Sequence, residues 1–395
     1  MPDSPLRNFD VTFENNMDVF QAGQVIKGQV ELELSEDMKM RLVQAGIQIV
    51  MKGEAWCKWM EKVSRHETLT FFSREHYFQD AQILWAPSQE KTNYNPVLPA
   101  GKHSFPFQYK LPSAGLPTSF ESEYGHVRYS AEAIIDQPRG KPDKKFKRIF
   151  TVLDIYDLNE DPNAMTPSTA QGSKTIGILM FTSDPIEINV QTDRGAYCPG
   201  EVIRLSGTIN NGSGTDIRHT TVQLIQMATC VATGKSDMGP MGNYTRTKYE
   251  SKTLNEVKTM TGCKAKSTAD LSGAGIALPI PAVPPSVKRH CGIIGVEYKV
   301  KFIVNIPGLH KNLEVDMPIT IGVIPLRTYY PQAPSFPLHP GDQPPQYTEG
   351  PPPPYFAVAT PAKIEKDQAD RGADCLGPKE FVPKYAYYDW HGKQP

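Results

Sequence analysis

The chain has 395 residues, a length typical of two or three domains, and its 42 basic and 43 acidic residues give a formal net charge of −1. This balance supplies no overall positive field, so nucleic acid and anionic membranes are excluded as default partners. Proline is over-represented, with 36 residues, of which 14 fall between Arg327 and Pro395. The composition therefore divides the chain into a globular body and a proline-rich tail.

Targeting and metal-binding signals are missing from the sequence. We find no stretch typical of a signal peptide and no run of about 18 apolar residues that would form a transmembrane segment. The six cysteines are widely spaced and form no CxxC pair, which argues against a disulfide framework and against a zinc site. We therefore expect a reduced, cytoplasmic protein with no metal and no cofactor.

Apolar and polar side chains alternate along the first 326 residues, most clearly at residues 29–34, 127–135 and 300–306. A period of two with one polar face predicts half-buried antiparallel strands, and glycine- or proline-containing turns separate them. No segment has the pattern of a long amphipathic helix, so we predict an all-β fold. The basic, weakly patterned stretch 237–269 is expected to be a loop inserted between strands.

The body also repeats itself. The segment at residues 20–26, FQAGQVI, reappears as YCPGEVI at residues 197–203, and the Val-x-Tyr at 127–129 recurs at 296–298. Two landmarks in the same order predict two copies of one domain, because solenoid repeats are much shorter. The polar stretch between them suits a linker, so the expected organisation is a first domain at 1–157, a linker at 158–174, a second domain at 175–326 and a tail at 327–395.

The two copies contain, in order, FQAGQVIKGQVEL, LPSAGLPTSFESEYGHVRYSAEAIID, YCPGEVIRLSGTINN, GIIGVEYKVKFIVNIPG and MPITIGVIPL. Over about residues 9–326 the chain resembles the arrestin-domain-containing proteins of the α-arrestin family. The resemblance implies two tandem immunoglobulin-like β-sandwiches, the arrestin fold, here followed by a disordered proline-rich tail. It also implies an adaptor that lies peripherally at the plasma membrane and endosomes and binds the cytoplasmic parts of membrane receptors or transporters.

The tail carries two Pro-Pro-x-Tyr (PPxY) motifs, at residues 344–347 and 352–355. Proline fixes φ and favours polyproline II, which WW domains bind in an aromatic groove. A proline-rich linker with chance tyrosines is the alternative, and the presence of two motifs disfavours it. The resemblance supplies the partner, a WW-domain HECT ubiquitin ligase. The residues expected to bind WW domains are Pro344, Pro345, Tyr347, Pro352, Pro353 and Tyr355.

Three weaker features remain. The degenerate sequence at residues 382–385, VPKY, lacks the first proline and is not expected to bind a WW domain. A basic patch suits phosphoinositides or acidic cargo tails, although a solvated hairpin with charged edge residues is the favoured explanation. That patch consists of Lys141, Lys144, Lys145, Lys147 and Arg148. Cys263 lies among lysines that can lower a thiol pKa, and a related family member binds thioredoxin through a cysteine of its second domain, so Cys263 is either a redox thiol or an inert one.

No GxSxG, P-loop, GxGxxG or HExxH motif occurs, so no enzyme is expected. The sequence predicts a non-catalytic adaptor that links membrane-protein cargo to WW-domain HECT ubiquitin ligases and thereby promotes cargo ubiquitination, endocytosis and endosomal sorting. Two alternatives stay open. One is a thiol-dependent, thioredoxin-binding regulator, and the other is a sorting scaffold of the retromer-subunit kind that functions without the tail.

Overall fold

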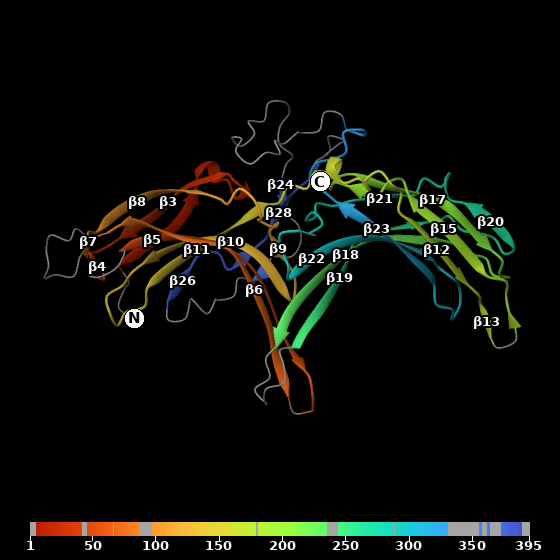
Figure 1. Ribbon diagram of the computed structural model, residues 1–395, viewed down its shortest axis with the longest axis horizontal. Helices are drawn as coiled ribbons and strands as arrows, with labels where there is room; N and C mark the ends of the chain where they lie inside the picture. Colours follow the sequence, from red (N-terminus) through yellow and green to blue (C-terminus); the bar gives the residue numbers. More distant parts are fainter. Residues whose placement is uncertain are drawn as a thin grey trace.

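The computed structural model describes residues 5–41, 46–65, 67–86, 97–178, 181–234, 244–287, 289–330, 355–357, 362–363 and 373–388. The regular structure of these residues is β-strand, apart from the short 3-10 helices η1 (Glu14–Asn16) and η2 (Leu158–Glu160). Figure 1 shows two elongated β-lobes arranged end to end, the N-terminal lobe in red to yellow and the C-terminal lobe in green to blue. The predicted all-β class is confirmed.

The N-terminal lobe is a sandwich of two sheets. One sheet consists of β1 (Leu6–Phe13), β3 (Val25–Leu34) and β8 (Gly101–Lys110). The other contains β6 (Thr68–Trp85), β5 (Ile47–Lys62), β10 (Gly125–Ile135), β11 (Lys144–Leu153) and β2 (Val19–Gln21). The short strands are β4 (Met38–Lys39), β7 (Val97–Leu98) and β9 (Phe120–Glu121). The rings of Phe13, Phe20 and Phe150 meet edge to face between the sheets, with centroids 5.4 to 5.7 Å apart.

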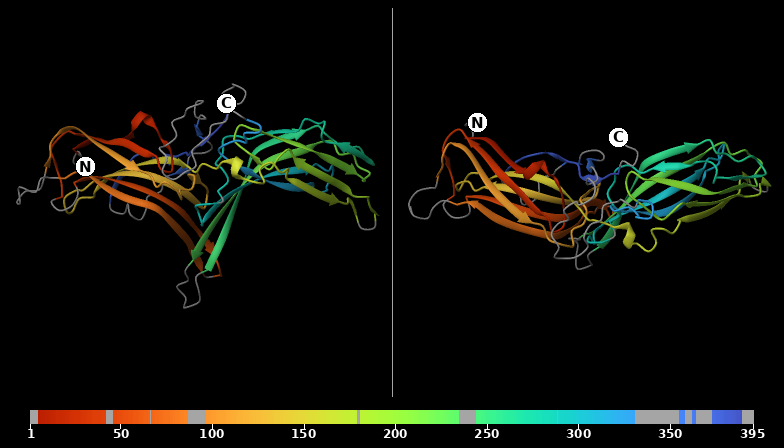
Figure 2. Two further views of the ribbon diagram at one scale, coloured as in Figure 1. Left: turned by 45° about the horizontal axis from the view of Figure 1, so that its top comes forward. Right: turned by 90° about the horizontal axis from the view of Figure 1, so that it is seen from above.

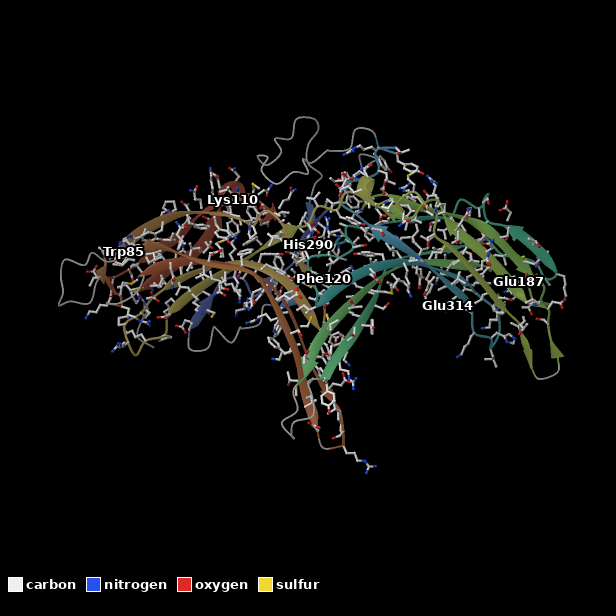
Figure 3. All side chains as sticks on the ribbon, in the orientation of Figure 1. Trp85, Lys110, Phe120, Glu187, His290 and Glu314 are labelled. Atoms are coloured by element: carbon white, nitrogen blue, oxygen red, sulfur yellow. The ribbon has the colours of Figure 1, made fainter. Side chains whose placement is uncertain are left out.

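The C-terminal lobe has the same two-layer build. Its first sheet consists of β12 (Thr169–Lys174), β15 (Ile186–Thr192), β17 (Val202–Asn211), β20 (Ser267–Asp270) and β21 (Ala277–Pro279). Its second contains β19 (Tyr244–Thr259), β18 (Thr220–Gly234), β22 (Ile294–Val304), β23 (Leu313–Ile321) and β16 (Ala196–Tyr197). A short hairpin joins β13 (Gly177–Ile178) to β14 (Phe181–Thr182). Figure 3 shows side chains filling the space between the sheets of both lobes.

The internal repeat is confirmed in three dimensions. In each lobe the strand of the first landmark pairs in parallel with the last long strand, β2 with β11 and β16 with β23. The tyrosines of the second landmark, Tyr129 and Tyr298, are both buried, and their hydroxyls donate to the carbonyls of Pro117 (2.6 Å) and Pro284 (2.7 Å). The equivalent tyrosines of the two copies are therefore held by equivalent hydrogen bonds to a proline carbonyl.

The two lobes share one sheet at their junction. Strands β6 and β18 pair there through Thr233 with Phe72 and Gly234 with Phe71, so the second sheets of the two sandwiches are continuous. The hairpins β5–β6 and β18–β19 leave the lobes at this point and converge into one projection (Figures 1 and 2). We call these paired hairpins the central hairpins.

Two stretches differ from the sequence expectation. Part of the expected linker, Thr169–Lys174, forms strand β12 at the edge of a sheet, and part of the expected loop 237–269 forms β19. Neither strand buries a regular apolar face, because β12 lies at a sheet edge and β19 is exposed along most of its length. Hydrophobic alternation, the signal used to find strands, is therefore absent from both.

The C-terminal tail also differs in part from the expected disordered tail. Residues 373–388 lie on the body and contain β26 (Asp374–Leu376), β27 (Glu380–Phe381) and β28 (Lys384–Ala386). Strand β26 extends the N-terminal sheet by pairing in parallel with β11. Two further strands pair with this region, β24 (Tyr355–Ala357) with β28 and β25 (Ala362–Lys363) with β27. We call residues 373–388 the docked segment.

Candidate functional site

Most of the PPxY residues fall outside the described part of the chain. Pro344, Pro345, Tyr347, Pro352 and Pro353 are all among these residues. The exception is Tyr355, the last residue of the second motif, whose backbone begins β24 and pairs with Ala386 of β28. Of the residues predicted to bind WW domains, Tyr355 is therefore the one that the structure describes, and its backbone pairs with the docked segment.

The docked segment is anchored to the N-terminal lobe around Tyr385. Only 3% of this side chain is exposed, and its hydroxyl donates to the carbonyl of Ser119 at 3.0 Å. Burial raises the pKa of the Tyr385 hydroxyl well above its usual value, so it stays a neutral donor. The neighbouring Lys384 donates its backbone N–H to Thr151 Oγ1 (3.1 Å) and its ammonium to Asp18 (2.6 Å).

The end of the segment is anchored to the C-terminal lobe through Tyr388. Its backbone N–H donates to the carbonyl of Pro199 at 3.1 Å, and its hydroxyl donates to the carbonyl of Val323 at 2.6 Å. The ring packs in a small apolar cluster with Leu158, Ala164, Ala196, Cys198 and Leu326. The docked segment thus fastens one lobe to the other, as its course across the junction in Figure 2 shows.

In the sequence, residues 382–385 resemble only a degenerate PPxY motif, whereas in the structure Tyr385 is a buried anchor. One available signal was composition, because Tyr385, Tyr387 and Tyr388 gather in a tail otherwise rich in proline and polar residues. Aromatic residues with a polar tip are suited to bury a ring while their hydroxyl finds a partner.

The predicted basic patch lies on and beside β11, and much of its charge is paired. Lys144 binds Asp374 of the docked segment, Lys147 binds Glu132 at 3.0 Å, and Arg148 donates to the carbonyl of Val11 at 3.1 Å. Lys145 also has an interaction partner, and Lys141 lies in the turn before β11. Pairing of this kind disfavours a free anion site, and because β26 pairs with β11 at Lys144 and Lys145, this part of β11 is not an open sheet edge either.

Cys263 lies in a different environment from the expected flexible basic loop. Its side chain is 3% exposed, and its thiol lies 3.2 Å from the carbonyl of Ser267. The nearby lysines are occupied elsewhere, with Lys264 bound to Asp216 (3.0 Å) and Lys266 bound to Asp184 (2.7 Å). A redox role for Cys263 would first require the surrounding core to open.

Three other thiols meet at the lobe junction, which sequence spacing could not reveal. Cys57 comes from β5, Cys230 from β18 and Cys291 from the loop before β22. A Cβ placed on Gly125 would lie 2.9 Å from the sulfur of Cys57 and 3.2 Å from that of Cys230, so the two buried thiols flank this glycine. Hydrogen bonding to Cys230 together with burial raises the pKa of Cys57. Cys291 is only half-buried, and burial raises its pKa as well.

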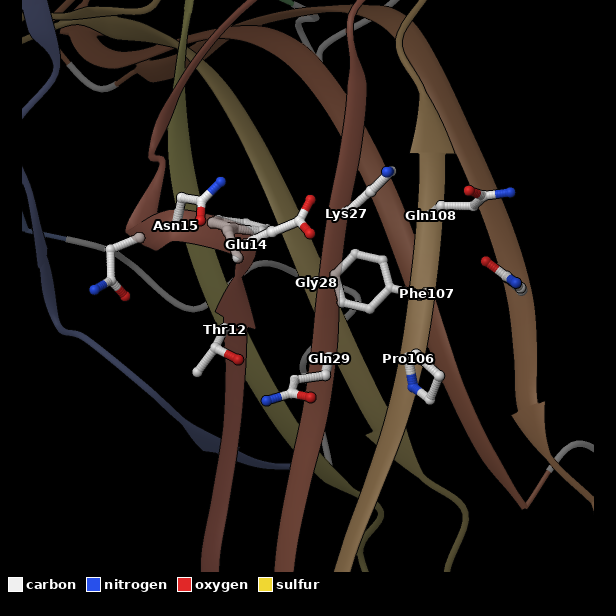
Figure 4. Close-up of a pocket in the computed structure, with 12 residues that line it drawn as sticks. Thr12, Glu14, Asn15, Lys27, Gly28, Gln29, Pro106, Phe107 and Gln108 are labelled. Carbon is white, nitrogen blue, oxygen red and sulfur yellow. The ribbon is translucent and has the colours of Figure 1, made fainter.

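A hollow lies in the N-terminal lobe (Figure 4). It measures about 840 Å³ and runs over β1, η1, β3 and β8, with Phe107 placed over Gly28. Many of the residues that line it are polar, Thr12 and Gln29 among them. A Cβ on Gly28 would lie 2.3 Å from the carbonyl of Thr12, so this glycine permits close packing of the strands.

Neither a metal cluster nor a membrane span emerges from the described residues. Among them, no group of three or more His, Cys, Asp or Glu side chains could hold a metal ion. Likewise, none of the helices in the described ranges combines the length and the apolar character needed to cross a membrane.

Comparison with known proteins agrees with this two-lobed architecture. Residues 9–159 match the family "Arrestin (or S-antigen), N-terminal domain", and residues 182–326 match "Arrestin (or S-antigen), C-terminal domain". Arrestin domain-containing protein 4 of Homo sapiens is 30% identical over 312 residues, which cover 78% of this chain and 68% of that protein. Its Mus musculus counterpart is 29% identical over 332 residues, or 82% and 74% of the two chains.

A second kind of relative carries a different name. Thioredoxin-interacting protein of Homo sapiens is 26% identical over 320 residues, which cover 80% of this chain and 74% of that protein. The two domain matches coincide with the two β-lobes, and the relatives extend across both of them. The chain therefore belongs to the arrestin family, within the arrestin-domain-containing, or α-arrestin, group of adaptor proteins.

Proposed function

We propose that this protein is a non-catalytic adaptor that binds WW-domain HECT ubiquitin ligases through its PPxY motifs and membrane-protein cargo through its arrestin body. The observation that supports it most directly is the pair of PPxY motifs following a two-lobed arrestin body that ends near residue 326. Proline-rich segments bind with little further loss of conformational entropy, because polyproline II is largely preformed. Function requires no chemical step by the adaptor itself.

The central hairpins are the surface we propose for cargo. They carry large apolar side chains in contact with solvent, including Met60 (70% exposed), Phe72 (43%) and Tyr249 (74%). Exposed apolar groups of this size on one projection are typical of an interaction surface. Cargo would be the cytoplasmic parts of membrane receptors or transporters, met at the plasma membrane and endosomes.

Tethering explains how such an adaptor would act. A ligase held on the tail and a cargo held on the body form one complex, which raises the local concentration of ligase at cargo lysines. Two PPxY motifs allow two WW modules of one ligase to bind together, and the gain in avidity is on the order of 10²–10⁴-fold. The proposed outcome is cargo ubiquitination followed by endocytosis and endosomal sorting.

The test is co-precipitation of a WW-domain HECT ligase with the full chain carrying Tyr347→Ala and Tyr355→Ala. We expect ligase binding to be lost, because both tyrosine pockets of the WW modules stay empty. The matched control is Pro337→Ala with Pro340→Ala, which removes two tail prolines outside the motifs and should retain the ligase. Undiminished binding by the double tyrosine variant would rule out the proposal and favour a scaffold that works without the tail.

A thiol-dependent regulator is the second candidate. Its support is the relative named Thioredoxin-interacting protein and the three thiols at the lobe junction, of which Cys291 is the half-buried one. The test is trapping, in the absence of reductant, of the mixed disulfide that forms when a thiolate of this protein attacks the disulfide of oxidised thioredoxin and one thioredoxin thiolate leaves. We expect Cys291→Ser to abolish the adduct and Cys263→Ser to retain it. An adduct that survives both substitutions, or no adduct at all, would contradict this candidate.

A further inference from the structure

Two buried thiols from different lobes meet at the lobe junction. Cys57 belongs to β5 of the N-terminal lobe and is fully buried, and Cys230 belongs to β18 of the C-terminal lobe and is 2% exposed. A Cβ added to Gly125 would lie within 3.2 Å of both sulfurs, and the two thiols hydrogen-bond to each other. They are therefore close enough to react with one another after a rotation of their side chains.

The surroundings of the two thiols come from both lobes. The Cys57 sulfur lies 3.5 Å from the carbonyl oxygen of Ile293 in the C-terminal lobe, and the same oxygen accepts the backbone N–H of Val231 at 2.8 Å. From the other side, Oγ of Ser122 in the N-terminal lobe lies 3.8 Å from the Cys230 sulfur. Each thiol is thus in contact with the lobe to which it does not belong.

One of the two thiols is the better nucleophile. Hydrogen bonding with Cys57 lowers the pKa of Cys230, Ser122 adds to this effect, and together they outweigh the opposing effect of burial. Hydrogen bonding with Cys230, together with burial, raises the pKa of Cys57. Because the thiolate is the form that reacts with oxidants, Cys230 should react first and Cys57 second.

A second hollow gives small molecules access to Cys230. It measures about 370 Å³ and is lined by residues of both lobes and of the docked segment, among them Ser122, Ala228 and Tyr385. Ser122 contacts the Cys230 sulfur, and Ala228 lies two residues before Cys230 on the same buried side of β18. A molecule as small as hydrogen peroxide in this hollow is therefore one side chain away from the Cys230 thiol.

We propose that Cys57 and Cys230 form an oxidation site, at which hydrogen peroxide converts the two thiols into a disulfide that joins the N-terminal lobe to the C-terminal lobe. The Cys230 thiolate attacks one peroxide oxygen, the O–O bond breaks with hydroxide leaving, and Cys230 becomes a sulfenic acid. The Cys57 sulfur then attacks the Cys230 sulfur, and the S–O bond breaks with a second hydroxide leaving. The two thiol protons convert both hydroxides to water, so one peroxide is reduced for each disulfide formed.

This disulfide would lie at the base of the central hairpins. Cys57 pairs with Ser73 of β6, and the preceding residue of β6, Phe72, pairs with Thr233 of β18. A covalent link beside this strand pairing restricts movement of one lobe against the other. The inference goes beyond the proposed function, because it requires neither a WW domain nor thioredoxin.

The experiment locates the disulfide in the full chain after treatment with hydrogen peroxide. The remaining thiols are alkylated in denaturant, and the chain is digested with trypsin without reductant and analysed by mass spectrometry. Trypsin releases the six cysteines in six separate peptides, so a link between residues 53–58 and residues 219–235 identifies Cys57 and Cys230. We expect this linked peptide, lighter than its two parts by two hydrogens, and its disappearance on reduction with dithiothreitol.

Substitutions test the order of the two steps. Cys57→Ser leaves the Cys230 sulfenic acid without a second thiol, so dimedone added with the denaturant should label residues 219–235. In Cys230→Ser, residues 53–58 should stay unlabelled. The matched control is Cys291→Ser, which removes the third thiol of the junction and should retain the link. The result for the unsubstituted chain does not depend on how well any variant folds.

The effect of the link on the lobes is measured by hydrogen exchange. Amides of residues 231–234, where β18 meets β6, should exchange more slowly in the oxidised chain than in the reduced one. Unchanged exchange there would contradict the restriction of lobe movement. Absence of the linked peptide, or links to Cys291 in its place, would overturn the oxidation site. Labelling of residues 53–58 in Cys230→Ser would overturn the order of attack.

Discussion

The contact between Gly200 and Tyr388 allows the docking of the C-terminal segment to be tested from the body side. Gly200 has a φ of +95°, and a Cβ there would lie 2.0 Å from the backbone oxygen of Tyr388. The equivalent turn of the first repeat offers a matched control. Gly23 has a φ of +81°, and a Cβ there would approach Ser113 no closer than 3.6 Å. Both turns also donate the glycine N–H to a carbonyl at 2.9 Å, Gly23 to Pro112 and Gly200 to Ile280.

The two alanine substitutions therefore share one cost and differ in another. A positive φ costs an L-residue about 1–2 kcal/mol, so both variants should lose that much free energy of unfolding. Gly200→Ala must in addition move the backbone of Tyr388, and this breaks two hydrogen bonds worth about 1 kcal/mol each. It also exposes a ring whose burial contributes about 1.5–3 kcal/mol. The docked segment should thus lose roughly 3–5 kcal/mol of local stability, the sum of these two effects.

Hydrogen exchange read out by mass spectrometry measures this difference. A loss of about 3 kcal/mol corresponds to a hundredfold faster exchange or more, since 1.4 kcal/mol is a factor of ten. We expect faster exchange at residues 384–388 in Gly200→Ala and unchanged exchange there in Gly23→Ala, with a fall in Tm for both that is larger for Gly200→Ala. If residues 384–388 exchange equally fast in the two variants, Tyr388 does not dock at this turn and the reasoning fails.

Two further predictions concern the buried polar groups. Burial raises the pKa of Glu201, and this outweighs the opposite effect of Arg194, so the folded state binds its proton more tightly than the unfolded state does. The free energy of unfolding should then fall as pH rises from about 4.3 towards the raised pKa, and Glu201→Gln should flatten this slope in urea titrations. An unchanged slope would contradict the assignment. Tyr129→Phe should cost about 1–3 kcal/mol by leaving the carbonyl of Pro117 unsatisfied. Tyr298→Phe should cost more, because that hydroxyl also accepts from Gln226 at 2.8 Å, and an inverted order in urea unfolding would refute this.

The sequence predicts the strands that bury one face. Val30, Leu32 and Leu34 alternate with polar residues in β3, and all three are buried as expected, because alternation directly records a strand with one face in the core. Strand β19 escapes this signal, since its partner β18 supplies the hydrogen bonds while most of its side chains stay in solvent. The duplication was also predictable, because both copies need glycine at a turn with positive φ.

The candidate sites were less predictable from the sequence. PPxY motifs are contiguous and can be read from the chain, whereas docking of residues 373–388 depends on acceptors at Ser119, Pro199 and Val323, which come from three distant parts of the sequence. The meeting of Cys57, Cys230 and Cys291 at the lobe junction also depends on contacts between distant parts of the sequence, so their spacing along the chain does not predict it. The flanking lysines suggest a flexible loop around Cys263, whereas its side chain is buried in the core.

A comparison of the repeated turns indicates which of the two was adapted for docking. Both copies satisfy the same backbone N–H with the side chain three residues on: Gln24 accepts from Gln21 at 2.9 Å, and Glu201 accepts from Cys198 at 2.6 Å. The second copy alone adds a charge, and Arg194 balances it at 3.1 Å while stacking on Tyr197 and Tyr329.

The ion pair between Arg194 and Glu201 restrains the second turn, whereas the first turn has the uncharged Gln24 at the position of Glu201. A buried carboxylate that loses its partner is strongly destabilising, so Arg194 and Glu201 hold each other and the turn between them in one geometry. Pro199 stands where the first copy has Ala22, and its carbonyl is the acceptor that meets Tyr388. A rigid turn presents this carbonyl at a fixed position, so Tyr388 loses less freedom on binding than it would at a mobile loop. The asymmetry of two otherwise equivalent turns is therefore what we expect if the docked segment recognises the second lobe specifically.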